Sequence, residues 1–126
     1  MILIDTDVMI CHLRGLEPAK GWLREAAQRD VLAASAVTVA EITGGMRSAE
    51  RREVWGLLSA LETISVTDVI ARRAGELQRR YRRSHSGIGI SDYLIAATAL
   101  HSGFELATLN VKHFPMFPGL APPFKV

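Results

Sequence analysis

The chain has 126 residues, of which 48% are hydrophobic and 22% are charged, and its formal net charge at pH 7 is +2. This length suits one domain with a buried core, so we expect a single domain over residues 1–126. The composition excludes a disordered or fibrous chain, and no uncharged run approaches the roughly 18 residues that a membrane helix needs. The single cysteine, Cys11, excludes a disulfide within the chain. These features predict a globular protein of the reducing cytoplasm that does not associate with membranes.

Positive charge is concentrated in one stretch. Between Ala71 and His85 there are six arginines and one acid, Glu76, so this stretch carries +5 and the remainder of the chain −3. A patch of this kind indicates a polyanionic partner. A solvated face that pairs with neighbouring acids, or the rim of a dimer interface, remains an alternative.

The first half of the chain alternates short apolar runs with helical patterns. Pro18 is a good first-turn residue, and Thr38-Val39-Ala40-Glu41 has the form of a capping box at the start of a helix. We expect strands at residues 2–4 and 31–35 and helices at 8–13, 18–29 and 38–45.

The second half continues the alternation. The segment SHSGIG, residues 84–89, predicts a loop, and Gly103 is a stop signal for the helix before it. We expect helices at 49–61, 68–83 and 90–101, strands at 63–66 and 104–109, and one helical turn at 110–114. Short strands alternating with helices predict an α/β fold, a three-layer α/β/α arrangement with a central, mainly parallel sheet.

Polar residues follow the predicted strands. Asp5 directly follows the first strand, Glu41 comes shortly after the second, Asp92 begins the helix before the last strand, and Asn110 follows that strand. The carboxyl ends of parallel strands meet at one edge of the sheet, so we expect these side chains to converge there. Three carboxylates without a counter-ion would repel one another, and a hard dication such as Mg²⁺ or Mn²⁺ would remove that penalty. Such an ion can activate water and stabilise charge on a phosphodiester.

Each acid also has a purely structural interpretation. Asp5 or Asp7 could cap the helix that follows, Glu41 could be only the capping-box partner of Thr38, and Asp92 could favour the helix dipole behind Ser91. Asp5 fits this interpretation least, because Thr6 or Asp7 could cap equally well.

Four ordered motifs resemble those of PIN-domain ribonucleases, most closely the VapC-type toxins of toxin–antitoxin pairs. They are ILIDTDVMI, VTVAEITGGM, GISDYLIAATAL and LATLNVKHF. The resemblance implies a doubly wound fold, an Mg²⁺- or Mn²⁺-dependent endoribonuclease, and a cognate antitoxin as partner. By motif it implies Asp5, Glu41 and Asp92 as the acidic, metal-binding core, with Thr6 in support. It also suggests a homodimer or a toxin–antitoxin hetero-oligomer.

The last motif departs from the family pattern. Asn110 stands where a fourth acid is common, and His113 precedes Phe114 where an aspartate is frequent. Asn110 can still ligate a metal or hold a water but adds no charge, and we expect Thr108 to orient it or the metal-bound water. Asp7 is an extra acid that we expect to support the site or to cap the helix.

The expected chemistry is in-line attack on RNA by a metal-activated water, leaving 5′-phosphate and 3′-hydroxyl ends. We expect four arginines to hold RNA phosphates: Arg79, Arg80, Arg82 and Arg83. Trp22 and Trp55 belong either to the core or to a groove for an antitoxin segment. Two alternatives remain open: a haloacid dehalogenase-type phosphatase with Asp5 as nucleophile, and a catalytically inactive PIN-like binding module.

Overall fold

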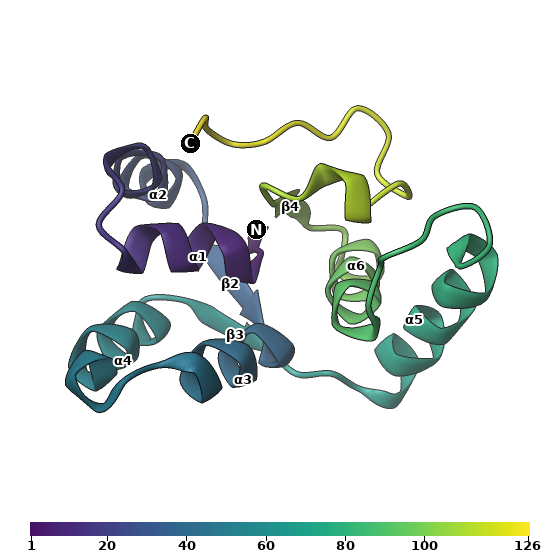
Figure 1. Cartoon of the computed structure of the whole chain (residues 1–126), viewed down its shortest axis with the longest axis horizontal. Coiled ribbons are helices and arrows are strands. Elements are labelled where there is room, and N and C mark those ends of the chain that lie inside the picture. Colours follow the sequence, from purple (N-terminus) through teal and green to yellow (C-terminus); the bar gives the residue numbers. More distant parts are fainter.

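A computed structural model describes residues 1–126 as a four-stranded parallel sheet between two layers of helices. The strands are β1 (Ile2–Ile4), β2 (Leu32–Ser35), β3 (Glu62–Ile64) and β4 (Glu105–Ala107), in the order β3-β2-β1-β4. The helices are α1 (Thr6–Leu13), α2 (Glu17–Arg29), α3 (Ala36–Gly45), α4 (Arg51–Ser59), α5 (Asp68–Tyr81) and α6 (Ile90–Ser102), with short 3₁₀ turns η1 (Ser48–Glu50) and η2 (Val111–His113). Figure 1 shows α1 to α4 on one side of the sheet and α5 and α6 on the other. The predicted three-layer α/β/α fold is confirmed.

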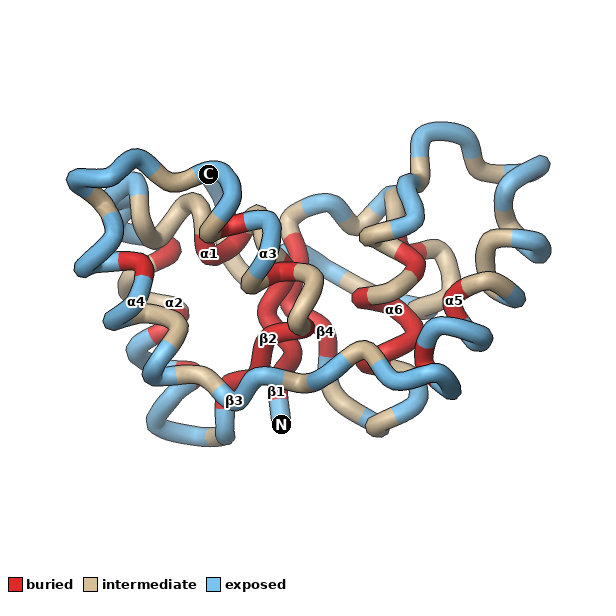
Figure 2. The backbone as a smooth tube through the Cα atoms, turned by 90° about the horizontal axis from the view of Figure 1, so that it is seen from below, coloured by how far each residue is buried: buried red, intermediate tan, exposed pale blue.

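The sheet divides the core in two because successive strand residues point to opposite faces. Ile2 and Ile4 of β1 pack into the cluster beneath α1 to α4, whereas Leu3 between them packs into the cluster beneath α6. All three side chains are almost completely buried, and β1 and β2 are buried along their whole length (Figure 2), whereas the edge strand β3 is not. A strand covered on both faces explains why residues 2–4 are an unbroken apolar run.

The predicted capping box at residues 38–41 is wrong. Helix α3 begins at Ala36, two residues before Thr38, and its N-cap is Ser35, whose hydroxyl accepts a hydrogen bond from the Val37 amide. Ser35 ends β2 and caps α3 at once, so the chain turns directly from strand to helix. Thr38 therefore lies within the helix and is fully buried, one turn before Glu41.

The other elements are present, with shifted ends. Helix α4 starts only after η1, α5 ends at Tyr81, and β3 and β4 are three residues each, shorter than expected. Helix α6 starts at Ile90 with Gly89 as its N-cap, so Ser91 does not cap it. Gly103 ends α6 in the left-handed region, with φ of 70°, as its stop signal predicted.

The two tryptophans differ in surroundings. Trp22 packs on the first cluster, with its ring centroid 6.4 Å from that of Phe124 in the C-terminal segment, whereas Trp55 is 46% exposed on α4. Cys11 is half-buried and free. None of the helices has the length and apolar character needed to span a bilayer.

Candidate active site

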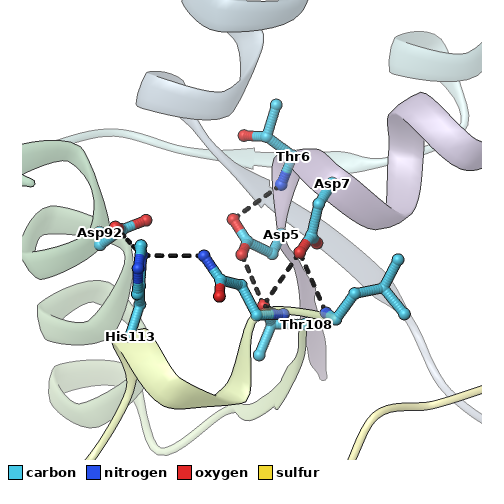
Figure 3. Close-up of polar contacts among 8 residues, drawn as sticks. Asp5, Thr6, Asp7, Asp92, Thr108 and His113 are labelled. Atoms are coloured by element: carbon cyan, nitrogen blue, oxygen red, sulfur yellow. Dashed lines mark hydrogen bonds and ion pairs between the residues drawn. The ribbon is translucent and has the colours of Figure 1, made fainter. Parts of the chain in front are cut away.

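The candidate site lies where the chain reverses its direction of travel across the sheet. From β1 the chain moves to β2 and β3 on one side, and it then returns past β1 to place β4 on the other side. In parallel sheets a crevice forms at the carboxyl ends of the strands at such a point. Asp5 follows β1 and Thr108 follows β4 there, and Figure 3 shows the two side chains facing each other.

Asp5 is a buried carboxylate held from two sides. Its Oδ1 accepts a hydrogen bond of 2.8 Å from the Thr6 amide, which makes Asp5 the N-cap of α1, and its Oδ2 accepts one of 2.7 Å from the Thr108 hydroxyl. The side chain is only 5% exposed. Burial and the neighbouring charges of Asp7 and Asp92 raise the pKa of Asp5 from 3.8 to about 7, although both hydrogen bonds act to lower it. Asp5 is therefore the N-cap of α1, a position that neither Thr6 nor Asp7 takes. Its burial disfavours the ionised form of its carboxyl group.

Asp7 is the second acid of this edge. Its Oδ2 accepts a hydrogen bond of 3.1 Å from the Leu109 amide, which ties α1 to the segment after β4. Its Oδ1 is buried and has no hydrogen-bond partner. Burial raises the pKa of Asp7 as well. An unpartnered carboxylate oxygen beside a second buried acid leaves negative charge without compensation.

Glu41 reaches the site through Thr6. The Thr6 hydroxyl donates a hydrogen bond of 2.7 Å to Glu41 Oε1 and lies 3.1 Å from the hydroxyl of Thr38. Thr38 and Glu41 share a face of α3 because they are one turn apart. Thr6 thus joins the start of α1 to α3, and its hydrogen bond restrains the exposed carboxylate of Glu41.

Asp92 is linked to Asn110 through His113. The His113 Nδ1 lies 2.9 Å from Asp92 Oδ2 and 2.8 Å from Asn110 Nδ2 (Figure 3). One ring nitrogen cannot donate to the carboxylate and accept from the amide at the same time. An unprotonated Nδ1 accepts from Asn110 Nδ2, whereas a protonated Nδ1 donates to Asp92 and requires the Asn110 amide to present its oxygen instead. The Asn110 backbone amide donates a hydrogen bond of 3.0 Å to the Thr108 hydroxyl. This contact involves the backbone of Asn110, so the orienting role of Thr108 stays a prediction.

The three predicted metal ligands do not form a close cluster. No group of three or more His, Cys, Asp or Glu side chains lies near enough together to hold a metal ion in this conformation. Asp5 and Asp92 lie close enough for the charge of Asp92 to act on the pKa of Asp5, whereas Glu41 is joined to Asp5 by way of Thr6. The expectation that all three carboxylates crowd into one pocket is therefore wrong in its strict form.

The chemistry of the donors nevertheless fits Mg²⁺ or Mn²⁺. The groups are oxygen ligands, Asp7 Oδ1 is unpartnered, and no lysine or arginine forms an ion pair with Asp5, Asp7 or Glu41. Mg²⁺ usually keeps several waters, and such waters can bridge carboxylates that do not touch the ion directly.

The arginine-rich stretch covers α5 and the turn after it. Of its six arginines only Arg72 forms an ion pair, at 3.0 Å from Asp68, while Glu76 forms none. The exposed arginines without an acidic partner include the four predicted to contact RNA: Arg79, Arg80, Arg82 and Arg83. The loop at 84–89 connects this surface to the site, because a Cβ atom at Gly87 would lie 4.0 Å from Nε2 of His113.

Sequence reasoning missed two residues that the fold brings into this site. His113 was expected only as a departure from a family pattern, yet its ring joins Asp92 to Asn110. Thr38 was placed at a helix cap, yet its hydroxyl contacts Thr6. The spacing of Thr38 and Glu41 along one helix face could have indicated the second contact.

Comparisons with known proteins agree with this fold. Residues 2–115 match the sequence model of the family described as PIN domain. The chain is 60% identical over 126 residues to Ribonuclease VapC10 of Mycobacterium tuberculosis, covering 100% of this chain and 95% of that protein. It is 46% identical over 125 residues to Ribonuclease VapC19 of the same organism, covering 98% and 100%. Its fold matches a toxin–antitoxin complex from Klebsiella pneumoniae with a TM-score of 0.81 at 27% identity, over the full length of both chains.

Proposed function

The chain belongs to the PIN-domain family, with VapC-type ribonucleases among its relatives, and on that premise we propose that it is a metal-dependent endoribonuclease and the toxin of a toxin–antitoxin pair. The observation that carries this proposal is Asp5. A buried carboxylate with a pKa raised to about 7, beside a second, half-buried acid and without an ion pair to a lysine or arginine, is the kind of site that a bound dication stabilises. The cytoplasmic location stays a prediction.

In this proposal Asp5, Glu41 and Asp92 hold Mg²⁺ or Mn²⁺, directly or through water, with Asp7 in support. When bound, such an ion supplies a nucleophilic water at neutral pH and stabilises charge on the phosphate. Thr108 fixes the orientation of Asp5 through its 2.7 Å hydrogen bond, and Thr6 does the same for Glu41. His113 contacts Asp92 and Asn110 contacts His113, so each of the three carboxylates has a hydrogen-bonding partner that restrains it.

The arginine surface supplies the contacts to RNA phosphates in this proposal. Arginines without acidic partners at the end of α5 can bind a backbone without reading its sequence. The loop at 84–89 leads from these arginines to His113, so a strand held there continues toward Asp92. The two groups together define a path from binding to cleavage.

The antitoxin is the proposed protein partner. A cavity of about 690 Å³ opens between α1, α2 and α4, and seven of its twelve lining residues are hydrophobic. Neither Trp22 nor Trp55 lines it, so this cavity is not the tryptophan-lined groove that was one of the two alternatives for these residues. A groove of this size and character suits an amphipathic segment of another protein. Whether the chain forms homodimers or only a hetero-oligomer with its partner stays a prediction.

The competing phosphatase function has little support. It requires a lysine beside the nucleophilic aspartate, and none of the lysines forms an ion pair with Asp5. The family match is to the PIN domain instead. The inactive binding module is excluded only by a measurement of catalysis.

Cleavage of RNA by the purified protein tests the proposal. We expect Mg²⁺- or Mn²⁺-dependent endonucleolytic cleavage that leaves 5′-phosphate and 3′-hydroxyl ends and stops in excess EDTA. Asp92→Asn should lose activity and bind metal more weakly by calorimetry, with an unchanged circular dichroism spectrum. The matched control is Asp68→Asn, an exposed acid at the start of α5. Equal cleavage with and without chelator would refute the metal dependence, and no cleavage under any condition would favour the inactive module.

A further inference from the structure

We propose that a second cavity, next to Glu41, receives one unpaired RNA base beside the scissile phosphodiester and thereby helps to select the cleavage sequence. This inference rests on the proposed nuclease function and names a determinant of its substrate specificity. The cavity lies between α1, α3 and the η1–α4 segment and has a volume of about 350 Å³.

The cavity adjoins the candidate active site through a shared residue. Glu41 forms part of its wall, and the same carboxylate accepts the 2.7 Å hydrogen bond from Thr6, the residue after Asp5. A nucleotide whose phosphate lies at the acidic edge therefore has this cavity as a neighbouring space. Single-stranded RNA is commonly recognised in this way, by turning an unpaired base into a protein pocket.

The lining of the cavity suits a neutral planar ring. Half of its ten lining residues are hydrophobic, including Ile10, Ile42 and Met46, which offer a surface for the face of a base. Its charged residues are two arginines and two glutamates, so their formal charges cancel. A bare phosphate would find no net attraction here, in contrast to the arginine surface of α5.

Two guanidinium groups stand free at this cavity. Arg14 and Arg47 form no ion pair, although two acids share the lining with them. The Glu50 carboxylate is already engaged, because it accepts a 2.7 Å hydrogen bond from the Arg47 backbone amide. A guanidinium can stack on a base or donate to its acceptor edge, so Arg14 and Arg47 are the residues that would contact the ring.

The volume of the cavity favours a single base over a segment of a partner protein as its occupant. At about 350 Å³ it is half as large as the cavity of about 690 Å³ between α1, α2 and α4. The larger cavity suits a polypeptide segment, whereas the smaller one is near the lower end of the range for small ligands. One base is therefore the occupant that the volume, the balanced charges and the contact with Glu41 favour together.

The glycine pair at the end of α3 provides a matched test. Gly45 lines the cavity and Gly44 does not, and a Cβ atom at either position meets no atom within 4 Å. Gly45→Leu should therefore add a side chain to the cavity from an unhindered Cβ, while Gly44→Leu adds the same side chain outside it. On a set of short RNAs that differ in the base beside the cleaved bond, we expect Gly45→Leu to lower kcat/KM about tenfold on the preferred RNA. It should change little on the poorest one, and Gly44→Leu should resemble the wild type.

An arginine pair tests the polar contact. Arg47→Gln should flatten the base preference, whereas Arg51→Gln, an exposed arginine outside the cavity, should preserve it. Binding of the same RNAs in EDTA, followed by fluorescence anisotropy, provides a measure that does not depend on catalysis. Weaker binding to the Gly45→Leu variant than to the Gly44→Leu variant is expected.

The outcomes separate this inference from the nuclease proposal. If the wild type cleaves RNA and the Gly45→Leu variant keeps its base preference and affinity, the pocket assignment is wrong. The same holds if Gly45→Leu weakens only the binding of a partner protein. If the wild type does not cleave RNA but Gly45→Leu weakens RNA binding, the pocket remains and the nuclease proposal fails. If it neither cleaves nor distinguishes the two variants in binding, both fail.

Discussion

The Thr108 hydroxyl donates a 2.7 Å hydrogen bond to the Asp5 carboxylate, joining residues that are 103 positions apart in the chain. Both residues are buried, at 0% and 5% exposure, and each directly follows one of the neighbouring parallel strands β4 and β1. The bond lowers the pKa of a carboxylate that burial and neighbouring charges raise. Thr108 therefore favours the ionised form of Asp5, on which the proposed metal site depends.

Replacing Thr108 by valine should raise the pKa of Asp5 further. The variant keeps the shape of the side chain but leaves Asp5 Oδ2 without its donor, which should cost about 1–3 kcal/mol of unfolding free energy. The ionisation of Asp5 can be followed by carbon-13 NMR of its carboxyl group, and stability by urea unfolding at pH 8.

The control for this change is Thr98→Val. Thr98 is also fully buried, but its hydroxyl donates only to the Leu94 carbonyl within α6. We expect a smaller loss of stability and no change in the titration of Asp5. Equal losses in the two variants with an unmoved Asp5 titration would contradict the role given to Thr108.

Asp5→Asn should stabilise the metal-free protein at neutral pH. The folded-state pKa of about 7 lies above the 3.8 of an ordinary aspartate, so between these pH values the folded state binds its proton more tightly than the unfolded chain does. The free energy of unfolding therefore falls as the pH rises through this window, and the loss is complete above about pH 7. A shift of this size corresponds to at most about 4 kcal/mol. Urea unfolding in EDTA from pH 3 to 9 should show a flatter profile for the variant, with a residual slope from Asp7.

Asp30, whose pKa is lowered in the folded state, provides the comparison. A hydrogen bond from the Val31 amide and contact with the N-terminal amine lower the pKa of Asp30. Its contribution to stability is present above the unfolded pKa and is lost as the pH falls, so Asp30→Asn should destabilise the protein at neutral pH. A fall in stability of the Asp5→Asn variant at pH 8 without metal would show that the buried charge is compensated in some other way.

Neutralising single arginines at the end of α5 should weaken RNA binding in a salt-dependent manner. Each phosphate contact to single-stranded RNA contributes about 0.7 to the slope of log K against log salt. We expect each single change of Arg79, Arg80, Arg82 or Arg83 to glutamine to reduce the magnitude of this slope by up to about 0.7. Anisotropy titrations in EDTA at several salt concentrations measure the slope. Arg72→Gln is the matched control, because Asp68 already pairs with that guanidinium. If Arg72→Gln reduced the slope as much as the others, the unpaired arginines would not be the RNA surface.

His113 can be tested with two amides of different length. The side-chain nitrogen of asparagine can occupy the place of Nδ1, which contacts Asp92 and Asn110, whereas that of glutamine extends toward the place of Nε2. His113→Asn should retain most activity, and His113→Gln should lose about 10- to 100-fold in metal affinity or activity, the usual effect of losing a partner of a metal ligand. Metal affinity by calorimetry and kcat at saturating RNA measure this difference. Identical behaviour of the two variants would mean that His113 does not position Asp92.

Local sequence patterns were sufficient for much of the fold because the signals are local. The apolar run at residues 2–4, Pro18 in the first turn of α2 and Gly103 after α6 each reflect the backbone at their own position. The predicted capping box failed because Ser35, three residues earlier, also has a hydroxyl, and only the end of β2 determines which of the two residues caps the helix. Such competition between neighbouring caps depends on where the strand ends in the sheet.

From the sequence alone it was possible to determine that acids follow the strands of an α/β domain, because hydrophobic periodicity and strand-end positions are properties of short segments. Only the tertiary structure decided which groups each acid meets. The strand order β3-β2-β1-β4 places Thr108 beside Asp5, and the turn after β4 brings His113 to Asp92. The tertiary structure also joins Glu41 to the site through Thr6 and does not pack it against the other carboxylates. Contacts between residues far apart in the chain depend on strand order and side-chain direction, which no local pattern of residues contains.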